Sequence, residues 1–169
     1  MLRSAGIVAL FVLAACGQTT AATEPSPSPV IAQGIWTQAL TLTGDLPGQI
    51  TSILPDDGAQ VSICSGGKAR NGDTWSESFY ATVDSTGDQW QMSISIDIFR
   101  GPGTYTNKDI HVVLQSPDNS KAWLNQDADK VTFTIERSQQ SGTIDAQLTN
   151  AATGKTAAER ITGHWNCRG

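Results

Sequence analysis

The chain has 169 residues, with 11 Lys and Arg against 16 Asp and Glu, so its formal net charge is −5 at pH 7. An acidic chain has no electrostatic attraction for nucleic acid or anionic lipid, which argues against both as its main electrostatic partner. It contains three Cys and two His, too few ligands to predict a metal site, and no phosphate-cradling loop. We therefore expect no metal and no cofactor.

The first 15 residues have the pattern of a secretion signal. Arg3 supplies one positive charge, and residues 7–15 are wholly apolar. This run is less than half of the about 20 residues that a membrane-spanning helix needs, so it is typical of a cleaved signal peptide. Its end, Leu13-Ala14-Ala15-Cys16, resembles the lipobox of bacterial lipoproteins.

That resemblance implies cleavage after Ala15 and attachment of lipid to the Cys16 thiol. Each buried methylene group contributes roughly 0.8 kcal/mol, so acyl chains on Cys16 would anchor the protein to a membrane. We expect this membrane to belong to a bacterial cell envelope, with the protein on its extracytoplasmic face. The alternative is a secreted protein that is cleaved nearby and keeps Cys16 unmodified.

Residues 16–34 lack the apolar side chains that a folded segment needs to offset the entropy of ordering. Their centre is Pro25-Ser26-Pro27-Ser28-Pro29. Alternating proline favours the extended polyproline II conformation, which rises about 3.1 Å per residue. The segment is therefore predicted to be a linker between the lipidated Cys16 and the rest of the chain.

Residues 35–169 have the length of one domain, and their apolar and polar residues alternate. The clearest case is residues 90–98, where Trp, Met and three Ile alternate with Gln, Ser and Asp. A period of two predicts a strand with one buried face. No segment shows a sustained period of 3.6, so no long helix is expected.

The same alternation predicts strands along the whole domain. Clear ones are expected at 36–43, 110–115, 131–135, 144–148 and 161–167, and weaker ones at 49–54, 60–64, 75–83 and around Trp123. Turn signals rich in Gly, Pro, Asn and Asp separate them. Segments 75–83 and 89–99 are predicted to pair as a hairpin. The pattern predicts an all-β fold, an antiparallel β-sandwich or a barrel, of about nine or ten strands.

The cysteines predict one disulfide. Lipidation of Cys16 would leave Cys64 and Cys167 as an even pair in an oxidising compartment, where paired thiols are normally oxidised. Cys167 shares the apolar phase of Trp165 in the last strand, which places it on the core side. The alternative is a pair of free buried thiols.

Three short runs resemble a pattern found in small, largely uncharacterised surface lipoproteins of bacteria. They are Gly101-Pro102-Gly103-Thr104-Tyr105-Thr106, residues 142–148, and Gly163-His164-Trp165-Asn166-Cys167. The resemblance implies an all-β domain whose terminal cysteine is held in a disulfide. It implies no activity, and it assigns no functional residue.

The residues that carry chemistry are not assembled into a catalytic motif. His111 and His164 both lie on the polar phase of their strands, and no nucleophile elbow is present. The pair Asp56 and Asp57 sits in a turn signal. Asn125, Asp127, Asp129 and Glu136 follow the spacing of a calcium loop, but Lys130 stands where such a loop needs Gly. An enzyme is therefore not expected.

Three residues are candidates for contact with a partner. Tyr105 and Trp123 are aromatic side chains outside the strong strands, and His111 is solvent-facing. Residues 100–109 form the longest irregular connection, and Tyr105 either faces a partner there or covers the core. We expect a monomeric binding or interaction module for a protein or glycan. A structural envelope lipoprotein, or an enzyme whose residues converge only in three dimensions, are the alternatives.

Overall fold

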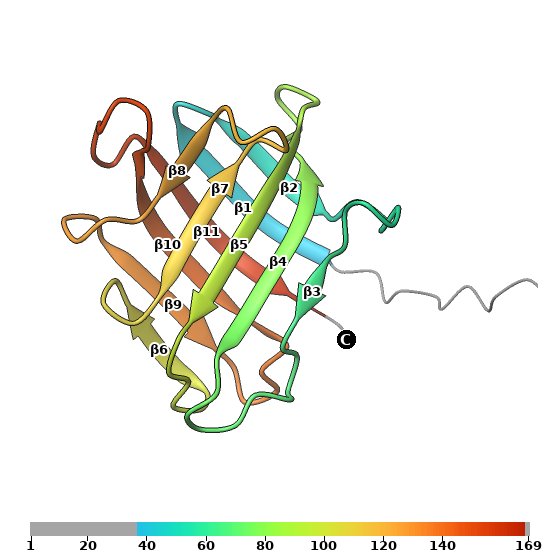
Figure 1. Cartoon of the computed structure of the whole chain (residues 1–169), viewed down its shortest axis with the longest axis vertical. Coiled ribbons are helices and arrows are strands. Elements are labelled where there is room, and N and C mark those ends of the chain that lie inside the picture. Colours follow the sequence, from blue (N-terminus) through green and yellow to red (C-terminus); the bar gives the residue numbers. More distant parts are fainter. Residues whose placement is uncertain (1–36, 168–169) are drawn as a thin grey trace, which may run out of the picture. The chain divides into compact units, whose positions relative to one another are not determined.

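A computed structural model describes residues 37–167 (Figure 1). All of these residues belong to a single compact unit. The predicted signal peptide, the predicted lipidation site Cys16, the predicted linker and Trp36 lie outside the described residues.

The described residues form strands and turns and contain no helix, which confirms the all-β prediction. The strands are β1 (Thr37–Gly44), β2 (Gly48–Ser52), β3 (Ile63–Cys64), β4 (Trp75–Thr82), β5 (Gln89–Ile96), β6 (Gly103–Thr106), β7 (His111–Gln115), β8 (Ala122–Leu124), β9 (Val131–Ile135), β10 (Ser141–Asn150) and β11 (Glu159–Asn166).

Two expectations about strand ends were wrong. Residues 100–109 are not an irregular connection, because β6 lies within them and pairs with β9. The long strand ends at Ile96 instead of Ile98, whose side chain is 65% exposed. The chain bends there, and the amide of Phe99 donates to the carbonyl of Asp73. Phe99, not Ile98, therefore enters the core.

All strand pairs are antiparallel, in the order β2-β1-β11-β10-β8-β7-β5-β4-β3, with β9 on β10 and β6 on β9. The predicted hairpin of β4 and β5 is confirmed. The sheet curls as a half-barrel with two layers: a front layer of β3, β4, β5, β7 and β8, and a rear layer of the other six strands (Figure 1). A bridge between Ile53 and Ala81 joins the layers after β2.

Strand β10 connects the two layers on the other side. Its first half pairs with β9 in the rear layer, and its last residues, Thr149 and Asn150, pair with β8 in the front layer. The side-chain alternation breaks where the partner changes, because Leu148 and Thr149 are both buried. β10 therefore belongs to the rear layer and, through its last two residues, also extends the edge of the front layer.

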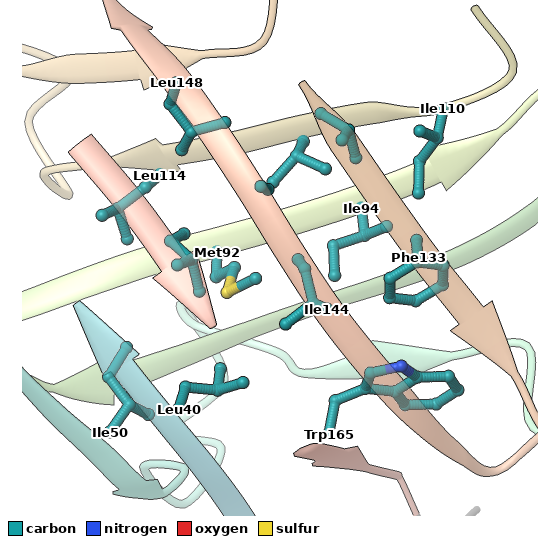
Figure 2. Close-up of a cluster of buried hydrophobic side chains, with 14 of the residues drawn as sticks. Leu40, Ile50, Met92, Ile94, Ile110, Leu114, Phe133, Ile144, Leu148 and Trp165 are labelled. Carbon is teal, nitrogen blue, oxygen red and sulfur yellow. The ribbon is translucent and has the colours of Figure 1, made fainter. Parts of the chain in front are cut away.

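The core lies between the layers and is filled by the apolar phase of each strand (Figure 2). Trp75 from the front layer packs on Phe133 and Trp165 from the rear layer, with ring centroids 5.2 to 5.5 Å apart. The four tryptophans of the described chain are buried. All four therefore belong to the core, including Trp123, which was expected to contact a partner.

The predicted disulfide between Cys64 and Cys167 is present. It ties β3 to the end of the described chain across a sequence separation of 103 residues. In the chain-entropy model, closing such a loop stabilises the fold by up to about 4.7 kcal/mol.

One carboxyl group faces the core. Glu77 on β4 is buried, and its Oε1 accepts a hydrogen bond from Gln38 Nε2 at 3.5 Å, whereas Oε2 has no hydrogen-bond partner among the described residues. The same Gln38 amide also donates to the carbonyl of Asn166. Burial raises the pKa of Glu77 to about 8, because the charged form would lose its hydration. The side chain therefore keeps its proton at neutral pH.

This burial predicts a specific dependence of stability on pH. In the unfolded chain Glu77 releases its proton above its ordinary pKa of 4.5, whereas in the folded chain it does not until about 8. The free energy of unfolding should therefore fall between these pH values, by up to about 1.4 kcal/mol per pH unit, and level off above them. In urea titrations, Glu77→Gln should be more stable than wild type at pH 8 and lose that advantage below pH 4.5. If the free energies of unfolding of the two proteins changed with pH in parallel, the raised pKa of Glu77 would be contradicted.

Candidate functional site

Four turns gather at one end of the domain, at the top of Figure 1: those between β1 and β2, β4 and β5, β7 and β8, and β10 and β11. Two hollows of about 320 and 330 Å³ open among these turns. Both are lined by Trp90, Ser120 and Lys121, so they adjoin. We call the two hollows together the turn-end groove.

The floor of the turn-end groove is a pair of tryptophans. Trp90 is the first inward residue of β5, and Trp123 is the middle residue of β8. Their ring centroids are 5.4 Å apart, and only 3% and 5% of their surfaces are exposed. The strands therefore place two large apolar rings directly beneath the turns.

The two indole N–H groups differ in their partners. Trp123 Nε1 donates to Asp45 Oδ2 at 3.2 Å. Trp90 Nε1 is buried and has no acceptor among the described residues. A buried donor without an acceptor is uncommon in folded proteins, so the Trp90 N–H is a feature that needs an explanation.

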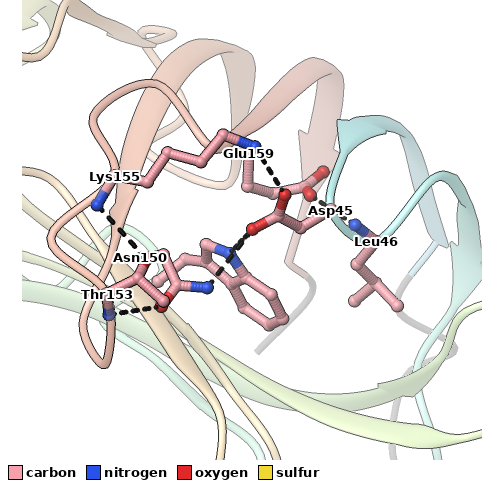
Figure 3. A network of polar contacts seen from close by, with 7 residues as sticks. Asp45, Leu46, Asn150, Thr153, Lys155 and Glu159 are labelled. Atoms are coloured by element: carbon pink, nitrogen blue, oxygen red, sulfur yellow. Dashed lines mark hydrogen bonds and ion pairs between the residues drawn. The ribbon is translucent and has the colours of Figure 1, made fainter.

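Asp45 ties two turns together on one side of the groove (Figure 3). Its carboxylate accepts hydrogen bonds from Lys155 Nζ at 2.9 Å and Asn150 Nδ2 at 3.2 Å, besides the one from Trp123. The hydrogen bond from Lys155 is the main reason why the pKa of Asp45 is lowered. Asp45 thus stays charged, and its acceptor sites are occupied from within the protein.

Glu159 supports the same turn from below. Its side chain is buried at the start of β11, and Oε2 accepts a hydrogen bond from the amide of Leu46 at 2.7 Å. Burial and the nearby charge of Asp45 raise the pKa of Glu159. The two carboxyl groups thus have opposite pKa shifts, but Glu159 has no exposed surface with which to touch a ligand. Its role in this arrangement is to hold the β1–β2 turn.

The β7–β8 turn is held by Asp118. Its carboxylate accepts hydrogen bonds from the hydroxyls of Ser116 and Ser120, at 2.6 and 2.8 Å, and from the amide of Ser120. The hydrogen bond from Ser116 is the largest of the effects that lower the pKa of Asp118 to about 2. The turn that carries Ser120 and Lys121 is therefore built in one fixed conformation.

The structure places the three predicted contact residues differently. Trp123 lies in the turn-end groove. His111 is exposed at the start of β7, with Nε2 3.6 Å from Asp97 Oδ2, whereas the groove follows the end of that strand. The structure therefore does not bring His111 to the site.

Tyr105 is not an exposed contact residue. It is 2% exposed, and it stacks on Phe99 with ring centroids 6.1 Å apart. Its hydroxyl donates to the carbonyl of Gly101 and accepts from the amide of Arg100. The alternation of β6 turns Tyr105 inward, so the interpretation that it covers the core is the correct one.

Several residues in and beside the groove were missed by sequence reasoning. Asp45, Lys121 and Lys155 stand in turns that have no distinctive motif, and Asp45 and Lys155 are separated by 110 positions. Trp90 was predicted only as a core residue. No spacing in the sequence links these positions, because the pairing of the strands brings them together.

The acidic loop near β9 proves to be structural. The carboxylate of Asp129 accepts hydrogen bonds from the amides of Gln126 and Ala157 and from the hydroxyl of Thr149. Within residues 37–167, no group of three or more His, Cys, Asp or Glu could hold a metal ion.

Among the residues that the structure describes, no helix has the length and the apolar character needed for crossing a membrane.

Comparison with protein-family models, with curated proteins and with solved structures finds no match to this chain. The functional assignment therefore rests on the sequence and on the geometry of the turn-end groove.

The placement of Tyr105 predicts that its loss destabilises the domain. Tyr105→Ala should lower the free energy of unfolding by about 3–5 kcal/mol and the melting temperature by about 10 °C, because a buried ring and two hydrogen bonds disappear. Tyr105→Phe should lose only about 1 kcal/mol, since it removes the hydroxyl alone. Calorimetry measures both, and an unchanged melting temperature for Tyr105→Ala would show that the ring is not part of the core.

Proposed function

We propose that this chain is a lipid-anchored protein of the bacterial cell envelope whose extracytoplasmic β domain binds a ligand in the turn-end groove. The observation that carries the proposal is the groove itself. It combines an apolar floor of two tryptophans with a rim of polar and charged side chains. Ligand sites in proteins are typically clefts of roughly 300–1,000 Å³ with this mixture of groups.

The location is supported by two independent features. Leu13-Ala14-Ala15-Cys16 resembles a lipobox, and the Cys64–Cys167 disulfide fits an oxidising compartment outside the cytoplasm. A proline-rich linker at about 3.1 Å per residue could lift the domain up to roughly 55 Å from the lipid. The groove would then be presented away from the membrane surface.

A structural envelope lipoprotein without a small-molecule site is the alternative class. Such a protein has no need of an ordered groove. Here the turn that carries Lys121 is held by Asp118, and the facing turns are held by Asp45 and Glu159. Pre-ordered side chains lower the entropy lost when a ligand binds, which favours the binding role.

Membrane association is predicted to depend on Cys16. Cys16→Ser should move the protein from the membrane fraction to the soluble fraction, because the lipid is the anchor. Fractionation of cells, followed by a salt wash and immunoblotting, measures the distribution. A Cys16→Ser protein that stays in the washed membrane pellet would contradict the lipoprotein assignment.

Ligand binding is predicted to be blocked by filling the groove. Ala152 lines the first hollow, and its exposed neighbour Ala151 does not. The low-molecular-mass fraction of a hydrolysate of the host cell envelope should raise the melting temperature of the wild type, because ligands stabilise the folded state that binds them. Ala152→Trp should abolish this rise, and Ala151→Trp, the matched control, should keep it. An equal rise in all three proteins, or in none, would contradict binding in the groove.

A further inference from the structure

The polar groups of the turn-end groove divide into those that are paired within the protein and those that are not. The carboxylates of Asp45 and Asp118 are paired: each accepts three hydrogen bonds from neighbouring side chains or amides. The ammonium group of Lys155 is paired with Asp45. These groups form the frame of the groove and offer little to a ligand.

One exposed donor in the groove has no acceptor. The Lys121 side chain lines both hollows, and its ammonium group makes no ion pair or hydrogen bond within residues 37–167. Trp90 also lines both hollows, but its Nε1 is buried, so its ring offers an apolar contact and not a donor. A ligand oxygen that accepts from Lys121 would make a hydrogen bond that the protein itself leaves unmade.

One acceptor in the groove is equally unpaired. Asp88 lines the second hollow and is exposed. Its backbone is hydrogen-bonded in the β4–β5 turn, but its carboxylate has no partner among the described residues. Asp88 and Lys121 form no ion pair with each other, although both line the second hollow. The two charges are therefore available to different groups of one ligand.

From this pairing we infer that the turn-end groove binds a small carboxylate-bearing ligand, with the carboxylate at Lys121 and a hydroxyl or ammonium donor at Asp88. The inference rests on the proposed binding function and specifies its ligand. Hydrogen bonds between a carboxylate and a charged donor are shorter and stronger than neutral ones. The indole floor would pack against the apolar part of the ligand.

Two sources supply this chemistry. A uronic acid unit carries a carboxylate and hydroxyl donors, and a short peptide carries a carboxylate and an ammonium donor. Glucuronate and alanyl-alanine are therefore the two probes, and glucose is the uncharged control. The measurement is quenching of tryptophan fluorescence in the full chain, purified in detergent, because two indoles form the groove floor.

Saturable quenching by glucuronate or by alanyl-alanine, with none by glucose, is the expected result, and the probe that binds identifies the source. Lys121→Gln should weaken this binding at least tenfold. Lys68→Gln removes an exposed lysine outside the groove and should leave binding unchanged. Raising NaCl to 0.5 M should weaken binding to wild type more than to Lys121→Gln, because salt screens the charge.

Three outcomes would overturn the inference. They are no binding of either carboxylate, equal binding of glucose, and unchanged affinity in Lys121→Gln. If the envelope hydrolysate still stabilises the wild type but not Ala152→Trp, only the ligand class is wrong and the groove remains a binding site. If the hydrolysate has no effect and no probe binds, the proposed function fails as well. Lys121 is an exposed turn residue, so Lys121→Gln is expected to keep the fold and the melting temperature of the wild type.

Discussion

Packing between the two layers is the interaction on which the rest of the domain depends. Trp75 from the front layer meets Phe133 and Trp165 from the rear layer, and this contact closes the core near the end opposite the turn-end groove. It requires a close approach of the strands. A side chain at Gly142 would collide with the carbonyl of Thr134, to which the Trp165 indole donates. Glycine there allows the rings to interlock.

The same packing determines where the groove forms. Inward positions along β5 and β8 continue up to Trp90 and Trp123, so the core ends in two aromatic rings at the level of the turns. Above these rings the chain changes from strand to turn, and the side chains that line the groove there are mostly polar. Asp45 links the core to the turns, because its carboxylate accepts hydrogen bonds from the Trp123 indole and from Lys155 in the β10–β11 turn. The groove is thus an extension of the core.

Charge is distributed unevenly over the domain. The outward positions of β4 and β5 carry Ser, Thr, Tyr and Gln and no charged residue, and they are linked through hydrogen bonds such as that between Ser78 and Ser93. Charged side chains concentrate in the turns, and beside the groove Asp45 is paired with Lys155, whereas Asp118 accepts hydrogen bonds from Ser116 and Ser120. Among the described residues at the groove, the charged groups of Lys121 and Asp88 have no hydrogen-bond or ion-pair partner.

The sequence by itself determined the all-β class, most strands and the disulfide, because a period of two and paired cysteines are local or countable signals. It did not determine whether Tyr105 faces a partner or the core, since one short strand, β6, decides that and its pattern is brief. It also could not show the groove. Only the tertiary structure decided that site, because strand pairing brings four turns from distant parts of the chain to one end of the sheet and sets which of their charges remain unpaired.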